Sequence, residues 1–408
     1  MLVAAGVFRP GYILGCVVLC SLATASCGEP RATWVSDGPT SQELDVIGTI
    51  SGDSISVSGI VRIAPCRVWL AGRRWGAIVE IDLRTGREKL IGRLPHWPVG
   101  TRLERGWEGE IFAWSSGSEV AMRLRATPMT ALSMVLPPHP WTDHVVGPMI
   151  IYGDTLLAVA PLGVEKEIRS PRPWKQAPLV MIVSQNGQLH GTVGWVPDRQ
   201  GLYLSSAQAQ ARLGVVGDTI VVASLNDAVI TKHVQTDPDV WEPIAQARLP
   251  RYFAIPEAWE AVWPVPWLDE ASEQVRVYTV PHFSEGSFGS DGTFWAIRNV
   301  RVRWNRRDSR LAERVYGMAG RWEVTDQVLE LYSSEGNLVN AYRIPGGEGS
   351  VSSVHVDEGA EFFLVGSDGA VTVVANPRSM RKPCEGPVWP IVLATVDSPT
   401  HEAILGGG

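Results

Sequence analysis

Six short segments of the chain share one pattern, in which a glycine- or aspartate-type turn leads into a strand with a large apolar residue at the matching position. The segments are 66–70, 109–113, 153–157, 217–221, 291–295 and 359–363. A repeated β unit cannot bury its apolar face alone, so each copy has to pack against its neighbours. The repeat therefore predicts an all-β chain in which small sheets close into a ring.

The clearest copy lies at residues 58–95 and contains four short runs of alternating apolar and polar residues with glycine-bearing turns. This alternation is typical of strands, so we expect each repeat to be a four-stranded antiparallel sheet. Two insertions interrupt the series. Residues 256–274 combine helix-forming, acidic and tryptophan-containing stretches and predict a small helical insertion. Residues 297–323 are rich in arginine and predict a long hairpin.

Residues 291–298 and 328–345 resemble the late blades of bacterial six-bladed β-propellers of the NHL/TolB-like type, and residues 68–86 are similar to a blade in the same way. The resemblance implies one six-bladed β-propeller of four-stranded antiparallel blades over residues 45–397. Fold resemblance does not select a function, because such propellers include binding proteins, scaffolds and enzymes.

Two segments at the ends of the predicted propeller are alternatives for the strand that closes the ring. Either residues 45–50 or residues 389–396 could supply the outer strand of the sixth blade, and we favour the N-terminal segment. Residues 28–44 are then expected to be a linker, and residues 398–408 a flexible C-terminal tail.

The N-terminus has the features of an export signal. Arg9 is the only charged residue before Glu29, and residues 12–25 are apolar and then small. This stretch is shorter than the about 20 residues that span a bilayer. Residues 1–27 are therefore expected to be a signal peptide. We favour cleavage at a bacterial lipobox, which would leave Cys27 as the lipid-bearing N-terminus.

This reading predicts a protein of the cell envelope, lipid-anchored and facing the periplasm or the cell exterior. The alternative is ordinary signal-peptidase cleavage after residues 23–25, which would give a soluble periplasmic or secreted protein.

Cysteine counting supports the lipid anchor. Cys16 and Cys20 leave with the signal, and acylation of Cys27 leaves Cys66 and Cys384 as an even pair, which suits an oxidising compartment. These two residues lie in the first repeat and beyond the last one, which a closed ring makes neighbours. We expect a disulfide between them at the closure of the ring, with two unpaired thiols as the alternative.

Charge and motifs argue against several functions. Only 19% of the residues are charged and the net charge is −7, which is not typical of nucleic-acid binding. The sequence contains no His-Glu-x-x-His, Gly-x-Ser-x-Gly or glycine-rich phosphate loop. No catalytic, metal or cofactor residue is predicted. Some polar residues could ligate a metal by type alone, but we interpret them as turn residues: Glu80, Asp82, Asn226, Asp227, Asp291 and Asp357, and His139, Asp143 and His144 of one loop.

Trp259, Trp263 and Trp267 of the insertion are candidate partner-binding residues, because aromatic side chains bring large contact area at small entropic cost. Packing of the insertion onto a blade is the alternative. The sequence favours a non-enzymatic binding or scaffold protein for an envelope protein, peptide or glycan. The competing hypothesis is a metal-dependent hydrolase or lactonase with its site in the central channel.

Overall fold

The computed structural model describes twenty-one parts of the chain, which are residues 33–35, 41–52, 56–72, 77–94, 101–115, 120–126, 129–135, 148–153, 156–159, 178–195, 211–225, 228–250, 262–263, 275–276, 283–306, 320–344, 351–356, 359, 361–379, 384 and 389–393. These residues form β-strands and turns, with a short 3-10 helix at Trp107–Gly109. Within them, no helix is long and apolar enough to cross a membrane.

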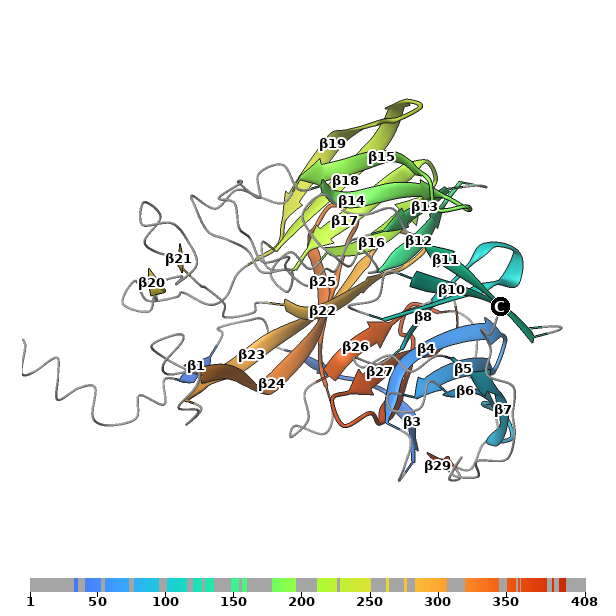
Figure 1. The fold of residues 1–408 in the computed structure, drawn as a ribbon. Helices are drawn as coiled ribbons and strands as arrows, with labels where there is room; N and C mark the ends of the chain where they lie inside the picture. Colours follow the sequence, from blue (N-terminus) through green and yellow to red (C-terminus); the bar gives the residue numbers. More distant parts are fainter. Residues whose placement is uncertain are drawn as a thin grey trace, which may run out of the picture.

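The first half of the chain forms three blades of four antiparallel strands each, which we call blades one to three (Figure 1). Blades three and four share one eight-stranded sheet, because their outer strands pair in parallel at Thr192 and Val240. Blade one consists of β4 (Val57–Ala64), β5 (Arg67–Gly72), β6 (Ala77–Asp82) and β7 (Arg87–Arg93). Blade two consists of β8 (Arg102–Arg105), β9 (Ile111–Trp114), β10 (Val120–Ala126) and β11 (Met129–Val135). Blade three consists of β12 (Met149–Tyr152), β13 (Leu156–Val159), β14 (Pro178–Ser184) and β15 (Leu189–Trp195).

The second half of the chain forms blades four to six in the same way. Blade four consists of β16 (Ala211–Val216), β17 (Thr219–Ser224), β18 (Val229–Asp237) and β19 (Val240–Arg248). Blade five consists of β22 (Phe283–Phe288), β23 (Phe294–Arg306), β24 (Gly320–Tyr332) and β25 (Leu338–Arg343). Blade six consists of β26 (Val351–His355), β27 (Glu361–Gly366), β28 (Val371–Ala375) and β3 (Val46–Ser51).

The first strand of each blade faces a common axis. Each of these inner strands contacts the inner strand of the next blade, and β26 of blade six contacts β4 of blade one. An apolar cluster lies at each boundary between blades, including the boundary between blades six and one, where Phe363 and Val373 pack with Val68 and Ile81. The sheets therefore close into a ring, and the prediction of an all-β propeller is confirmed.

The ring is closed by the N-terminal segment. Strand β3 pairs antiparallel with β28, through partners such as Ile50 and Val371, and so forms the outer edge of blade six. The C-terminal strand β29 (Ile391–Val392) pairs parallel with the other edge of β3. The preferred closing strand is thus confirmed, and the competing C-terminal segment lies outside it.

A disulfide between Cys66 and Cys384 joins blade one to the C-terminal part of the chain. Their Cα atoms lie 5.6 Å apart although 318 positions separate them in the sequence. Cys66 occupies the β4–β5 turn with a left-handed φ of 58°. This bond lies beside the blade-six boundary, as the ring prediction required.

The long hairpin predicted in the fifth repeat is present. Strands β23 and β24 pair over their full length and project beyond the body of the propeller, where β1 (Thr33–Val35) adds to β23 (Figure 1). Strand β2 (Gln42–Glu43) pairs parallel with β25. The described residues of the expected 28–44 linker therefore join blade five as strands. Residues 1–27 and 398–408 lie outside the described residues.

The predicted helical insertion at 256–274 is described only at Val262–Trp263. These two residues form strand β20, which pairs with β21 (Val275–Arg276), so this part of the insertion is extended and not helical. Pro264 follows directly, and proline disfavours the helical conformation in the residue before it. The remainder of the insertion lies outside the described residues.

Candidate functional site: the channel cavity

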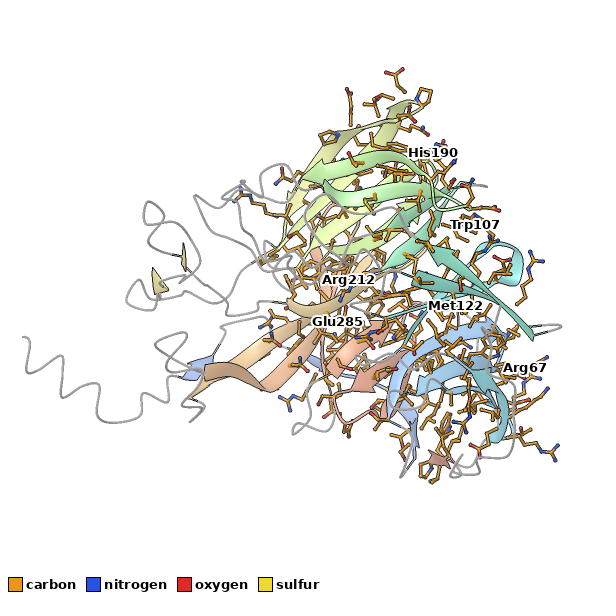
Figure 2. The ribbon with its side chains drawn as sticks, in the orientation of Figure 1. Arg67, Trp107, Met122, His190, Arg212 and Glu285 are labelled. Carbon is orange, nitrogen blue, oxygen red and sulfur yellow. A yellow bond between two sulfur atoms is a disulfide. The ribbon has the colours of Figure 1, made fainter. Side chains whose placement is uncertain are left out.

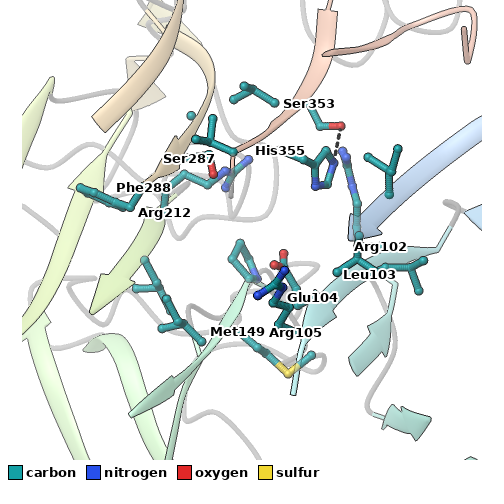
Figure 3. Close-up of a pocket in the computed structure, with 18 of the residues that line it drawn as sticks. Arg102, Leu103, Glu104, Arg105, Met149, Arg212, Ser287, Phe288, Ser353 and His355 are labelled. Atoms are coloured by element: carbon teal, nitrogen blue, oxygen red, sulfur yellow. Dashed lines mark hydrogen bonds between the residues drawn. The ribbon is translucent and has the colours of Figure 1, made fainter. Parts of the chain in front are cut away.

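A cavity of about 230 Å³ lies at the axis, where the inner strands of all six blades contribute to its wall (Figure 3). We call it the channel cavity. Part of its wall is apolar and includes Trp114, Met149 and Phe288. The rest carries ionisable side chains from five of the inner strands: Arg62, Arg102, Glu104, Arg105, Arg212, Glu285 and His355.

Arg212 and Glu285 form an ion pair across the boundary between blades four and five. On β16, Ala211 and Leu213 pack toward blade three, so the alternation of the strand turns Arg212 toward blade five. There Arg212 Nε donates to Glu285 Oε1. Both residues lie near the centre of the molecule in Figure 2, whereas the labelled Arg67 and His190 lie at its periphery.

Glu285 is ionised in spite of its burial. Burial alone raises the pKa of its carboxyl, but the charge of Arg212 and its hydrogen bond act in the opposite direction, as do Arg102 and the Gly286 N–H. Together they hold the pKa below its usual value. The Arg212 guanidinium is fixed on its other side as well, because Nη1 donates to the Ala211 carbonyl oxygen at 2.8 Å.

Glu104 lies on the opposite side of the channel and behaves differently. Its neighbour Leu103 packs between blades one and two, which turns Glu104 toward the cavity. Among the described residues, no hydrogen bond or ion pair reaches its carboxyl group. Burial raises the pKa to about 7, against the lowering effect of Arg102 and Arg212 and with a small contribution from Glu285. Glu104 is therefore about half protonated near neutral pH.

His355 on β26 is neutral at physiological pH. Its Nε2 lies 3.0 Å from the hydroxyl oxygen of Ser353, which is buried (Figure 3). Burial lowers the pKa of the imidazole to about 3, with Arg102 and Arg212 adding to the effect and Glu285 opposing it. The imidazole thus adds no charge to the cavity.

Trp114 lines the cavity with its ring, which packs in the apolar cluster between blades two and three. Its side chain is 4% exposed, and its indole N–H has no hydrogen-bond partner in the described part of the chain. A buried N–H without a partner costs free energy comparable with a lost hydrogen bond.

The charges favour an anionic ligand. Near pH 7, Arg102 and Arg212 are both positive, Glu285 is paired, and Glu104 carries on average about half a charge. The same two arginines repel a divalent cation from the carboxylates. Across the described ranges, no group of three or more His, Cys, Asp or Glu side chains is arranged to hold a metal ion.

Of the residues singled out in the sequence, those that the structure describes do not line this cavity. Trp263 lies on β20, and Cys66 and Cys384 are bonded to each other. Trp259, Trp267 and Cys27 lie outside the described residues, as do Asn226, Asp227, Asp357, His139, Asp143 and His144.

Three of the carboxylates interpreted as turn or strand residues have structural partners. Glu80 accepts from the indole N–H of Trp69 at 3.1 Å, and Asp82 accepts from the backbone N–H of Arg84 at 2.8 Å. Asp291 accepts from the Thr293 hydroxyl in the β22–β23 turn at 2.6 Å.

Sequence reasoning missed Arg102, Glu104, Arg212, Glu285 and His355. The signal available in the sequence is a single charged or imidazole residue in the first strand of a repeat, as in Leu103-Glu104 and Ala211-Arg212. That signal is weak, because a strand at a sheet edge commonly carries such residues toward solvent.

Comparisons with known proteins find similarity to solved structures at low sequence identity. No protein-family model and no curated protein matches the chain. Among solved structures, it is similar to virginiamycin B lyase from Staphylococcus aureus, with 11% identity and a TM-score of 0.44, over 82% of this chain and 98% of that one. A putative gluconolactonase shows 12% identity and a TM-score of 0.45, over 85% and 99% of the two chains. The WD40 β-propeller domain of Doa1 shows 11% identity and a TM-score of 0.44, over 82% of this chain and 97% of that one.

Proposed function

We propose that this chain is an exported, lipid-anchored β-propeller of the NHL/TolB-like type that acts as a non-enzymatic binding protein, with its recognition site in the channel cavity. The observation that carries this proposal is the convergence of six inner strands on one cavity that holds fixed charges. A volume of about 230 Å³ is smaller than the roughly 300–1,000 Å³ of pockets for drug-sized ligands. The cavity suits a small ligand or one terminal group of a peptide or glycan.

Binding is favoured over metal-dependent hydrolysis by the electrostatics of the cavity. A metal enzyme needs several carboxylate, amide or imidazole groups that converge on one cation and bind it through their oxygen or nitrogen atoms. Here the carboxylates of Glu104 and Glu285 are both within the field of Arg102 and Arg212. This arrangement retains an anion more readily than a cation.

The recognition site is tested by filling the cavity. Ser287 lines the cavity and is half-buried, so Ser287→Trp is expected to obstruct it; Ser133→Trp on the exposed face of β11 is the matched control. The full chain is screened by thermal shift against short peptides, oligosaccharides and small organic acids. We expect compounds that raise the melting temperature of the wild type and of Ser133→Trp, but not of Ser287→Trp. Equal shifts in both variants would overturn the proposal.

Export and lipid attachment are supported by the apolar N-terminal segment ahead of Cys27 and by the Cys66–Cys384 disulfide, because disulfides persist in oxidising compartments. Cells that express the full chain in a bacterial host are labelled with radioactive palmitate. We expect label on the wild-type protein and none on Cys27→Ser. Unlabelled wild-type protein would show that the anchor is absent.

A further inference from the structure

We propose that the channel cavity binds a small oxyanion, a carboxylate or a phosphate, between Arg102 and Arg212, and that Glu104 takes part in the complex in its protonated form. This inference rests on the proposed function of the cavity and names the chemistry of its ligand. It draws on the fixed geometry of Arg212, on the second positive charge of Arg102, and on the absence of polar partners for Glu104 in the described residues.

Arg212 is held ready for a ligand. Its Nε binds Glu285 and its Nη1 binds the Ala211 carbonyl oxygen, which leaves Nη2 without a hydrogen-bond partner among the described residues. A guanidinium that is already fixed loses little side-chain entropy when it binds an anion. Guanidinium groups also match the planar geometry of carboxylate and phosphate oxygens.

Arg102 brings a second positive charge from the other side of the channel. Figure 3 shows Arg102 coming from β8 and Arg212 from β16, with His355 between them in the upper part of the cavity. Both arginines line the same cavity as Glu104 and His355, and both act electrostatically on these two residues. Two cations from different blades, the second and the fourth, give an oxyanion two points of attachment.

Glu104 is the group that decides how strongly the anion is held. Ionised, it would repel the ligand and offset one arginine; protonated, it offers an O–H donor. The other ionisable side chains that line the cavity are Arg102 and Arg105 from β8 itself, Arg62 from β4, Arg212 from β16, Glu285 from β22 and His355 from β26. Strand β12 contributes only the uncharged residues Met149 and Ile150 to the cavity wall.

Among the described residues of the cavity wall whose pKa is shifted, Glu104 is the residue that changes its charge near neutral pH. Arg62 is occupied by Glu361, whose Oε2 lies 2.9 Å from its Nη2. Glu285 stays ionised and His355 stays neutral over this range. The pKa of Glu104 is about 7, so its protonated fraction falls from about 0.9 at pH 6 to about 0.1 at pH 8. Anion affinity is therefore expected to fall by about tenfold over this interval.

Titration calorimetry on the full chain in detergent tests the proposal, with sulfate, succinate and inorganic phosphate as probes. Sulfate does not change its own charge between pH 6 and pH 8, so its affinity reports the protein alone. We expect sulfate to bind about tenfold more weakly at pH 8 than at pH 6. Tighter binding of phosphate or of succinate then identifies which oxyanion the cavity prefers.

The variants separate the roles of the residues. Glu104→Gln mimics the protonated acid and should keep the pH 6 affinity at both pH values. Arg212→Gln should weaken binding at least tenfold, and Arg102→Gln gives the same test without disturbing the Arg212–Glu285 ion pair. Arg84→Gln, at an exposed turn of blade one, is the matched control and should bind as the wild type does.

Two outcomes would overturn the inference. Wild-type protein that binds none of the three anions at pH 6 excludes an oxyanion ligand, and a pH dependence retained in Glu104→Gln excludes the role of Glu104. Neither result touches the proposed function, which fails only if the Ser287→Trp variant still binds its ligands. The two failures are therefore distinguishable.

Discussion

At the scale of single residues, the protein keeps ionisable side chains in its interior by giving most of them partners on other strands. Arg298 Nε lies 2.6 Å from Glu330 Oε1 inside blade five, and both side chains are almost fully buried. Arg62 and Glu361 form a similar pair between blades one and six. A buried charge is tolerated when a counter-charge and hydrogen bonds offset its desolvation. Glu104 lacks such a pair within the described residues, which is why its proton is retained.

The pKa shifts of Glu104 and His355 predict opposite dependences of folding stability on pH. The pKa of Glu104 is about 7 in the folded state, above the 4.5 of an unperturbed glutamate. The contribution of Glu104 to stability therefore decreases as pH rises from 4.5 to about 7. The folded state keeps His355 neutral down to about pH 3, below the usual 6.5, so its contribution decreases as pH falls from 6.5. Between pH 4.5 and 6.5 the two slopes offset each other in the wild type.

Melting temperatures measured from pH 3 to pH 8 check this. Relative to the wild type, His355→Gln should gain stability as pH falls from 6.5 to 4.5, whereas Glu104→Gln should lose stability over the same range. His190→Gln, on an exposed position of β15, should follow the wild-type curve. Parallel curves for all three variants would contradict the assignment.

At the scale of elements, the closure of the ring depends on a strand and a covalent bond. Strand β3 completes blade six, and the Cys66–Cys384 disulfide fixes the C-terminal segment beside the β4–β5 turn. Cys384 also donates its backbone N–H to Glu361, the partner of Arg62. The disulfide is thus connected by hydrogen bonds to the wall of the channel cavity.

We expect removal of this disulfide to cause a large loss of folding stability. A bond that closes a loop of more than 300 residues restricts the unfolded chain strongly, and native disulfides typically contribute about 2–5 kcal/mol. Cys66→Ala, Cys384→Ala and the double variant should lose the same amount in urea unfolding, because each removes the one bond. Wild-type protein under a reducing agent is the matched control. A double variant as stable as the oxidised wild type would contradict the prediction.

The register of the repeats could not be predicted from the sequence. The large residues that define the repeat do not occupy one structural position, because Trp69 and Phe112 pack toward the following blade whereas Phe294 and Phe362 pack toward the preceding one. Both faces of a blade are buried against neighbours, so no polar face marks the register. An alignment of apolar residues therefore locates the strand but does not show which neighbouring blade each of its side chains packs against.

At the scale of the whole molecule, the sequence predicted the ring, its closing strand and its disulfide, because each follows from repetition and from the proximity of the ends in a closed ring. It did not predict the channel cavity. The cavity is assembled from residues between Ile60 and Phe363, and no repeat adds more than three ionisable side chains. Their chemistry becomes apparent only when the six inner strands face a common axis.

The origin of the outer strand of blade six also sets an order of events in biosynthesis. Strand β3 is made within the first 51 residues, whereas its partner β28 is completed only at Ala375. The nascent chain therefore carries an early strand with no pairing partner until β28 has also been synthesised. A product truncated before that point would keep β3 as an unsatisfied edge, open to aggregation and to proteases.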